Sequence, residues 1–242
     1  MKRILRFGFF SGVAGGCAMA LFSFFVARGP IEDALAYEES LAHSHDGASA
    51  QDEMFSRGVQ EVGGLVGIMI FAAALGLIFA IVLAALAPRM GRISPMIASA
   101  GLGVVGFWTV VIVPFLKYPA NPPGVGNSEN INQRTLLYFT LLAASILLTV
   151  AVFRIQASLQ RSQVRRAWTG VALYCVGLGA ILLVFPPADA VSAPADLVWN
   201  FRLASLGGLA VAWVVMALTL GTLLTSNVMA RPETATATDL SV

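Results

Sequence analysis

The sequence predicts an all-α fold, that of a polytopic integral membrane protein with about six transmembrane helices in a single domain. Of its 242 residues, 57% are hydrophobic and only 12% are charged, whereas soluble domains usually carry about 25% charged residues. Several continuous apolar runs reach the length of about 20 residues with which a helix crosses a bilayer. These runs do not alternate between apolar and polar residues, which argues against the strands of a membrane β-barrel.

The first span is expected at residues 7–27, after a basic N-terminal start. A cleaved secretory signal is the alternative, but the apolar run continues well beyond Cys17, where a signal would be cut. Three glycines, Gly8, Gly12 and Gly16, are spaced four apart and therefore share one helix face. Small residues on one face predict close approach to another helix. The alternative is that glycine is simply common in membrane helices.

The first polar segment, residues 28–58, is acidic and contains both histidines of the chain, His43 and His45. We expect it to be a loop outside the membrane. Residues 30–42 begin with proline and two acidic residues, as helices often do, so they predict a short amphipathic helix within this loop.

The later apolar runs predict five more spans, separated by short polar connectors. Pro114 is expected to kink the third span near its end, because a proline removes a backbone donor. The deep parts of the spans lack charged residues and histidine, so an ion path would have to use neutral groups. These spans are expected at residues 59–87, 94–116, 135–153, 168–184 and 201–225, and the neutral candidates are Met19, Met69, Met96, Ser99, Thr109, Ser145, Thr149, Ser205 and Thr219.

The distribution of basic residues predicts the orientation in the cell membrane. Most lysines and arginines lie at the start of the chain, in the two connectors after the second and fourth spans, and in the tail. Basic connectors stay in the cytoplasm. Both termini are therefore expected to be cytoplasmic, residues 1–226 to form the transmembrane domain, and residues 227–242 to be a disordered tail. The outer loops are then residues 28–58, 117–134 and 185–200.

The three outer loops resemble one another. Each begins with a proline-containing exit and ends with an arginine near the next helix: Arg57, Arg134 and Arg202. Asn132 and Asn200 stand two residues before the last two arginines. Three tandem helical hairpins, a kind of repeat common in transporters, would explain this pattern. The alternative is that arginines simply extend to the membrane surface at helix ends.

The middle outer loop is unusually rich in proline, which restricts the backbone on both sides of each ring. We interpret it as a rigid surface that shapes a vestibule, docks a partner, or pairs with acidic residues near the first outer loop such as Glu53 or Glu61. Its lysine and arginine would repel a cation, so it is not expected to be a ligand set. The residues assigned to this surface are Lys117, Tyr118, Pro119, Asn121, Pro122, Pro123, Asn132 and Arg134, together with Asn200, Arg202 and Arg57.

Three segments resemble the CbtA family of predicted cobalt transporter subunits. They are residues 115–126 (FLKYPANPPGVG), residues 132–138 (NQRTLLY) and residues 199–206 (WNFRLASL). The resemblance extends over most of the chain. It implies five or six spans, Co²⁺ as the transported ion, and a small one-span partner subunit similar to CbtB. A homo-oligomer, in which further copies of this chain assemble, is the alternative.

A candidate metal capture site lies in the first outer loop. Co²⁺ accepts imidazole and carboxylate ligands, and the loop supplies His43, His45 and Asp46, with Glu38 and Glu39 nearby. Because neutral histidine is the ligand, binding should weaken below about pH 6.5. The alternative is a solvated acidic loop with two incidental histidines.

No enzyme motif stands out, since the chain lacks a phosphate-binding Walker loop and the common nucleophile and zinc-protease patterns. The short basic segment 154–166 is explained by membrane orientation, so nucleic-acid binding is not expected. No cofactor is expected either. The resemblance therefore implies a membrane subunit of a divalent metal-ion transporter, with cobalt uptake as the expected function. The alternative function is a non-transporting scaffold or sensor whose outer loops bind a partner protein or a metal.

Overall fold

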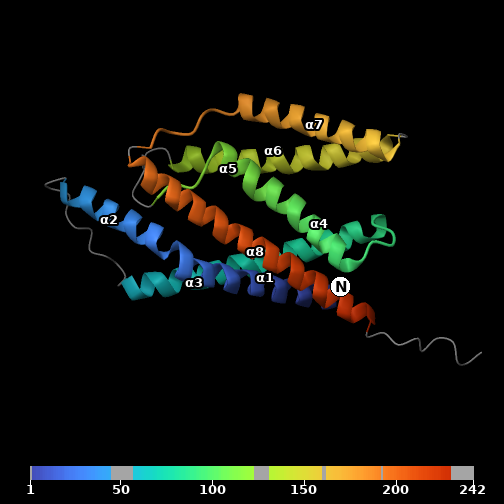
Figure 1. The fold of residues 1–242 in the computed structure, drawn as a ribbon, viewed down its shortest axis with the longest axis horizontal. Coiled ribbons are helices and arrows are strands. Elements are labelled where there is room, and N and C mark those ends of the chain that lie inside the picture. Colours follow the sequence, from blue (N-terminus) through green and yellow to red (C-terminus); the bar gives the residue numbers. More distant parts are fainter. Residues whose placement is uncertain (1, 45–56, 123–130, 160–161, 192, 230–242) are drawn as a thin grey trace, which may run out of the picture. The chain divides into compact units, whose positions relative to one another are not determined.

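The computed structural model describes residues 2–44, 57–122, 131–159, 162–191 and 193–229. Every regular element within these ranges is helical, as Figure 1 shows. The α-helices are α1 (Lys2–Phe22), α2 (Arg28–Ser44), α3 (Arg57–Leu86), α4 (Pro95–Phe107), α5 (Val113–Lys117), α6 (Ile131–Ser158), α7 (Gln163–Val184) and α8 (Ala195–Met229). Two π-helical turns, Ser23–Ala27 and Trp108–Ile112, link α1 to α2 and α4 to α5, and a 3₁₀ turn, Ala87–Arg89, follows α3.

Six helical stretches in the described part of the chain are long and apolar enough to cross a membrane. This confirms the predicted all-α membrane fold. The repeat of three tandem hairpins stays a prediction. The stretches are Lys2–Ser40, Val62–Arg89, Pro95–Lys117, Ile131–Ser158, Val164–Val184 and Ala195–Ser226.

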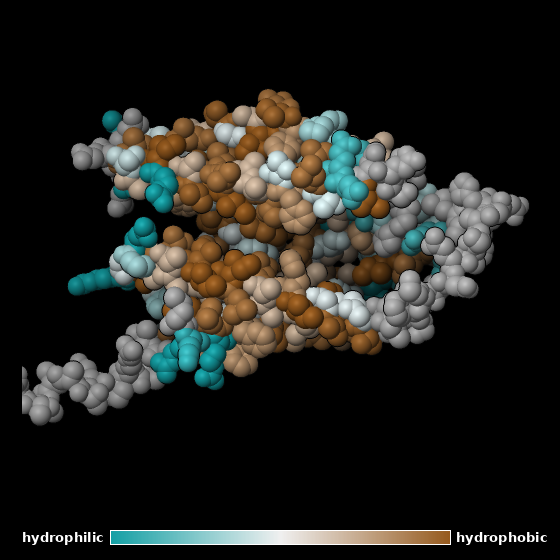
Figure 2. Space-filling view, turned by 180° about the vertical axis from the view of Figure 1, so that it is seen from behind, coloured by the Kyte–Doolittle hydropathy of each residue, from teal (hydrophilic) through white to brown (hydrophobic). Residues whose placement is uncertain are grey.

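Large apolar side chains are exposed along these helices. Leu183 is 86% exposed, Val104 72% and Ile97 65%. Figure 2 shows hydrophobic residues over most of the face that it draws. In water such a surface would be costly, whereas hydrocarbon tails cover it without a hydrophobic penalty. The exposed apolar surface therefore fits a chain whose helices face lipid.

The chain divides into two compact units. The first contains Met1–Phe24, Asp52–Val104 and Gly208–Val242, and the second contains Phe25–Gln51 and Val105–Gly207. Helices α4 and α8 each contribute residues to both units.

In the first unit, α1 packs on α3 through the glycine face predicted from the sequence. A Cβ atom added at Gly8 would lie 2.7 Å from the Gly76 carbonyl oxygen, and one at Gly16 would lie 2.9 Å from the Ala72 Cβ. A Cβ at Gly12 would collide with the Ala72 carbonyl oxygen. Only glycine allows the two backbones to come this close, which confirms the prediction of a close helix contact.

Helix α8 completes the first unit by packing on α4 and α3. The Ser99 hydroxyl, fully buried, donates a hydrogen bond of 2.7 Å to the Ala217 carbonyl oxygen. A Cβ at Gly103 would lie 2.6 Å from the Ala217 Cβ. The rings of Phe79 and Trp213 meet edge to face with centroids 6.0 Å apart, a favoured aromatic geometry.

In the second unit, α6 and α7 form an antiparallel pair (Figure 1). Gln156 donates from Nε2 to the Arg166 carbonyl oxygen at 3.3 Å. Further from the ends at which the chain passes from α6 to α7, Gly177 makes room for the side chain of Leu148. Residue numbers fall along α6 as they rise along α7, from the pair 156 and 166 to the pair 148 and 177, so the two helices form an antiparallel hairpin.

Candidate functional site

Helix α5 ends at Lys117, and the chain leaves the helical conformation at Tyr118, which has φ −128° and ψ 73°. The ring of Pro119 disfavours a helical conformation for the residue before it. The Tyr118 amide still donates to the Pro114 carbonyl oxygen at 2.8 Å. The proline-rich segment therefore starts immediately after a closed last helical turn.

The ammonium group of Lys117 caps a neighbouring helix. Its Nζ donates to the Leu182 carbonyl oxygen at 2.8 Å. Leu182 lies in the last turn of α7, where carbonyl groups lack intrahelical donors and the helix dipole favours a positive charge. Lys117 thus satisfies an acceptor of the protein itself.

Tyr118 joins the connector after α5 to the connector after α7. Its hydroxyl donates to the Pro186 carbonyl oxygen at 2.9 Å. Burial raises the pKa of the Tyr118 phenol above its ordinary value of 10.0, because desolvation disfavours the charged phenolate. The hydroxyl therefore stays protonated, and remains a donor, at physiological pH.

Arg202 fastens the same segment to α8. Its Nε donates to the Ala120 carbonyl oxygen at 3.1 Å, and its terminal nitrogen donates to Asn121 Oδ1 at 2.9 Å. The planar guanidinium group can make two such directed bonds at once, which a lysine cannot. Pro122, the next residue of the segment, is buried.

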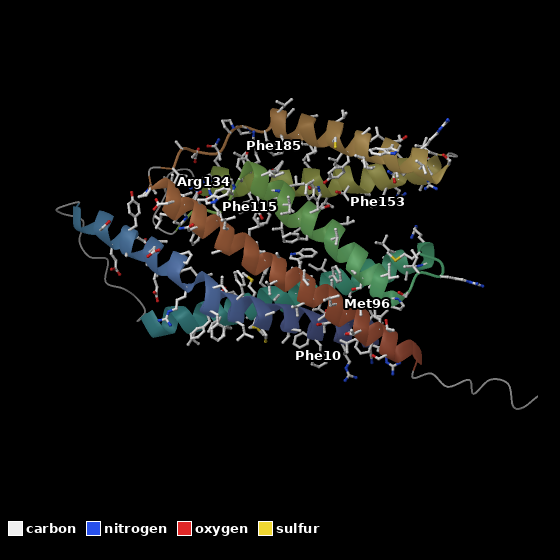
Figure 3. The ribbon with its side chains drawn as sticks, in the orientation of Figure 1. Phe10, Met96, Phe115, Arg134, Phe153 and Phe185 are labelled. Carbon is white, nitrogen blue, oxygen red and sulfur yellow. The ribbon has the colours of Figure 1, made fainter. Side chains whose placement is uncertain are left out.

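Arg134, in the first turn of α6, pairs with Asp189 of the connector after α7. Its Nε lies 3.8 Å from Asp189 Oδ2, and the two side chains are 37% and 43% exposed. A pair this open to its surroundings stabilises little. Figure 3 labels Arg134 near the beginning of α6 and Phe153 towards the other end of that helix.

The sequence did not single out Asp189 as a functional residue, although its charge on the expected outer side offered a signal. The backbone carbonyls of Leu182, Ala120 and Pro186 carry no sequence signal at all. We call Lys117, Tyr118, Asn121, Arg134 and Arg202 the connector cluster. Each member bonds to an atom of the second unit itself.

The other residues predicted for this surface are less closely held or lie outside the described part. Asn132 and Asn200 are exposed, and Pro119 is half-buried. Arg57 is the first residue of α3, but its side chain lies outside the described residues, as does Pro123. The role of this surface as a vestibule or docking site stays a prediction.

The predicted metal ligands fall largely outside the described residues. Helix α2 reaches Ser44, with Glu38 half-buried and Glu39 exposed. His43 belongs to α2, four positions after Glu39, while its side chain and all of His45 and Asp46 lie outside the described part. Within the described ranges, no three histidine, cysteine or acidic residues stand close enough to hold a metal ion. The histidine site therefore stays a prediction.

Three of the neutral candidates in the spans form a buried hydroxyl cluster where the Trp108–Ile112 turn meets α6. Ser145 Oγ donates to the Thr109 carbonyl oxygen at 2.8 Å, and Thr149 Oγ1 donates to the Ser145 carbonyl oxygen at 2.9 Å. The Thr109 and Thr149 hydroxyls are 3.0 Å apart. Because Thr149 already donates its proton, Thr109 must be the donor between them. We call Thr109, Ser145 and Thr149 the hydroxyl cluster.

The methionine candidates lie in the first unit and fill space beside glycines. The Met69 sulfur would lie 3.1 Å from a Cβ added at Gly16, and the Met96 sulfur 2.8 Å from one added at Gly221. Flexible thioethers commonly fill irregular gaps of this kind. The contacts of these methionines are thus those of packing residues.

No curated protein and no solved structure matches the chain. The sequence model of one family, described as "Probable cobalt transporter subunit (CbtA)", matches residues 1–225. This confirms the resemblance carried by residues 115–126, 132–138 and 199–206, and a transporter-subunit family implies a non-enzymatic role. The chain, a helical membrane protein with six candidate spans among its described residues, therefore belongs to the CbtA family.

Proposed function

We propose that this chain is the membrane-embedded subunit of a cobalt uptake system. The observation that carries the proposal is the family match over residues 1–225, which includes all but one residue of the six apolar stretches. The word "subunit" in the family description supports a partner. We take that partner to be a small protein with one membrane span, as the resemblance implied, and further copies of the chain as an alternative.

The proposed orientation leaves both termini in the cytoplasm and α2 and the connector cluster outside. The excess of arginine and lysine in the opposite connectors supports it. The test is labelling of single cysteines by a reagent that cannot cross the membrane, in a chain whose Cys17 and Cys175 are replaced by serine. We expect labelling at residue 200 and none at residue 91. The reverse pattern would overturn the orientation.

We further propose that the end of α2 captures the ion before passage. His43 follows Glu39 by four residues in this helix, so their positions are adjacent along one face. His45, Asp46 and Glu38 would complete a set of imidazole and carboxylate ligands, which Co²⁺ accepts. Such a site must hold the ion weakly enough to release it onward.

Equilibrium binding of Co²⁺ to the full chain in lipid nanodiscs tests this capture site. We expect His43→Ala combined with His45→Ala to weaken binding about tenfold or more, because losing two ligands should cost at least as much as losing a residue that only orients a ligand. Glu32→Gln is the matched control, because Glu32 lies on the same helix and already bonds to Arg28 at 2.7 Å. Equal affinity of the wild type and the double histidine variant would show that the histidines are not ligands and would favour the alternative of a solvated acidic loop.

Uptake of radioactive cobalt by cells tests the function itself. Expression of the chain with its partner should raise uptake, and excess unlabelled cobalt should suppress it more than equal Mg²⁺. If the purified chain binds Co²⁺ but expression leaves uptake unchanged, the result would favour the alternative of a membrane sensor or scaffold.

A further inference from the structure

The third span leaves one buried carbonyl without a backbone donor. In the turn Trp108–Ile112, the Val113 amide donates to the Trp108 carbonyl oxygen, five residues earlier. In the same register, the next bond would run from the amide of residue 114 to the Thr109 carbonyl. Residue 114 is a proline, which has no amide proton. The Thr109 carbonyl must therefore find its donor elsewhere.

A side chain from α6 replaces the missing amide. The Ser145 hydroxyl donates to the Thr109 carbonyl oxygen at 2.8 Å, and Ser145 is fully buried. In a lipid environment an unsatisfied carbonyl costs several kcal/mol, so this bond keeps the interrupted helix intact. The contacts of Thr149 with Thr109 and Ser145 hold the hydroxyl groups in place.

We propose that the turn Trp108–Ile112 together with Pro114 is a hinge of the third span, and that the Ser145 hydroxyl is its latch. A π-helical turn inside an α-helix is a frequent mark of a functional position, and a proline removes the bond that would otherwise make the helix continuous. A bond from a neighbouring helix can be released when the two helices move apart, unlike a bond within one helix. Because the latch consists of hydroxyl groups and a backbone carbonyl, the hinge needs no charged group in the membrane.

Hydrogen exchange of the backbone amides of residues 105–117, in the full chain in nanodiscs, tests the latch. Ser145→Ala should speed exchange there about tenfold, because it leaves a buried acceptor unsatisfied. Thr140→Val is the matched control: the Thr140 hydroxyl donates only within α6, to the Leu136 carbonyl oxygen at 2.7 Å. The control should leave exchange in this segment unchanged. Unchanged exchange in Ser145→Ala would overturn the latch.

Pro114→Ala tests the hinge even if Ser145→Ala does not fold. The alanine restores an amide that can reach the Thr109 carbonyl, so exchange in residues 105–117 should fall below that of the wild type. Combined with Ser145→Ala, it should bring exchange back to about the wild-type rate. If Pro114→Ala leaves exchange unchanged, or fails to rescue Ser145→Ala, the carbonyl of Thr109 is not the weak point and the hinge is wrong.

A transport readout separates a moving hinge from a static joint, and this readout alone rests on the proposed function. Pro114→Ala should lower the initial rate of cobalt uptake severalfold while the protein stays folded. Slower exchange with an unchanged uptake rate would overturn the hinge. If the wild type itself carries no cobalt, the proposed function fails, and the exchange measurements still decide whether the Thr109 carbonyl is the weak point of this helix.

Discussion

At the scale of single residues, the charged side chains of the connector cluster interact with oxygen atoms of the protein itself. Lys117 and Arg202 both bond to backbone carbonyls, and Arg202 also bonds to the side chain of Asn121. These bonds fix the backbone after α5 against α7 and α8. The prediction of a rigid segment rested on its prolines, and the structure adds side-chain bonds that hold residues 117–121.

Arg202→Lys should destabilise the chain although it preserves the charge. The lysine loses the planar fork that bonds to Ala120 and Asn121, and a hydrogen bond to a charged group contributes about 1.5–3 kcal/mol. Thermal unfolding in detergent should show a lower midpoint. The matched control is Arg154→Lys at an exposed position of α6, which should change the midpoint little. Equal midpoints for the two variants would show that the fork does not stabilise the segment.

Tyr118→Phe should cost about 0.5–1.5 kcal/mol of unfolding free energy near neutral pH, the contribution of one hydrogen bond. The pH dependence follows from the raised pKa of Tyr118. A raised pKa in the folded state means that the contribution is fully present below the unfolded value, 10.0, and is lost as pH rises through the folded value. Unfolding of wild type and variant, compared at neutral and strongly alkaline pH, should show a difference that disappears at high pH. A constant difference would contradict the hydrogen bond.

The sequence singled out the residues of the connector cluster but did not show what they contact. Lys117, Arg134 and Arg202 stand out because they are charges beside a proline-rich segment of an apolar chain. Their partners are mainly carbonyl groups, which every residue possesses. Chain packing alone selects the carbonyls of Leu182 and Ala120, so no pattern of side chains could have predicted them.

At the scale of helices, the spacing of glycines within α1 predicted that this helix packs closely on another helix, which the structure shows to be α3. Glycine every fourth residue is a local property that can be read directly from a sequence. The partner helix became clear only from the structure, in which Gly76 and Ala72 meet the glycine face.

Gly12→Ala should destabilise this helix pair by about 1–3 kcal/mol or more, the usual cost of overpacking, because the added methyl meets the backbone of Ala72. Gly67→Ala on α3 is the matched control, since a Cβ there meets nothing within 4 Å. It should be neutral or stabilising by about 0.5–1 kcal/mol. Unfolding in a titration of denaturing detergent distinguishes the two. A mild effect of Gly12→Ala would mean that the helices separate more readily than the packing indicates.

The hydroxyl cluster could not have been assembled from the sequence. Thr109, Ser145 and Thr149 are ordinary polar residues of membrane helices, and each was a neutral candidate among several. The cluster depends on the register of one helix against another and on a π-helical turn, and neither leaves a periodic pattern. Pro114 was the visible sign of an irregular helix at this point, and the turn ends two residues before it.

At the scale of the whole molecule, hydropathy predicts the number of spans because membrane insertion depends on continuous apolar length, which is local information. The position of a metal site, in contrast, depends on contacts between residues that lie far apart in the sequence. The described residues include Glu38, Glu39 and the backbone of His43, but not His45 or Asp46. The proposed capture site is therefore tested by measurements of metal binding.

Cobalt binding by the full chain should weaken as the pH falls from about 7.5 to about 5.5, since histidine with an ordinary pKa of about 6.5 becomes protonated and ceases to be a ligand. Titration in nanodiscs at several pH values measures this change. The double variant His43→Ala/His45→Ala should show a much flatter dependence. A wild-type affinity independent of pH over this range would exclude histidine ligands.

The initial rate of radioactive cobalt uptake tests the proposed transport function most directly. It should be measured in cells that lack other cobalt importers, with the chain and the proposed one-span partner present or absent. We predict that the rate rises severalfold with both proteins and falls towards background with His43→Ala/His45→Ala, at equal amounts of folded protein. Equal rates with and without the expressed proteins would contradict a role in cobalt uptake.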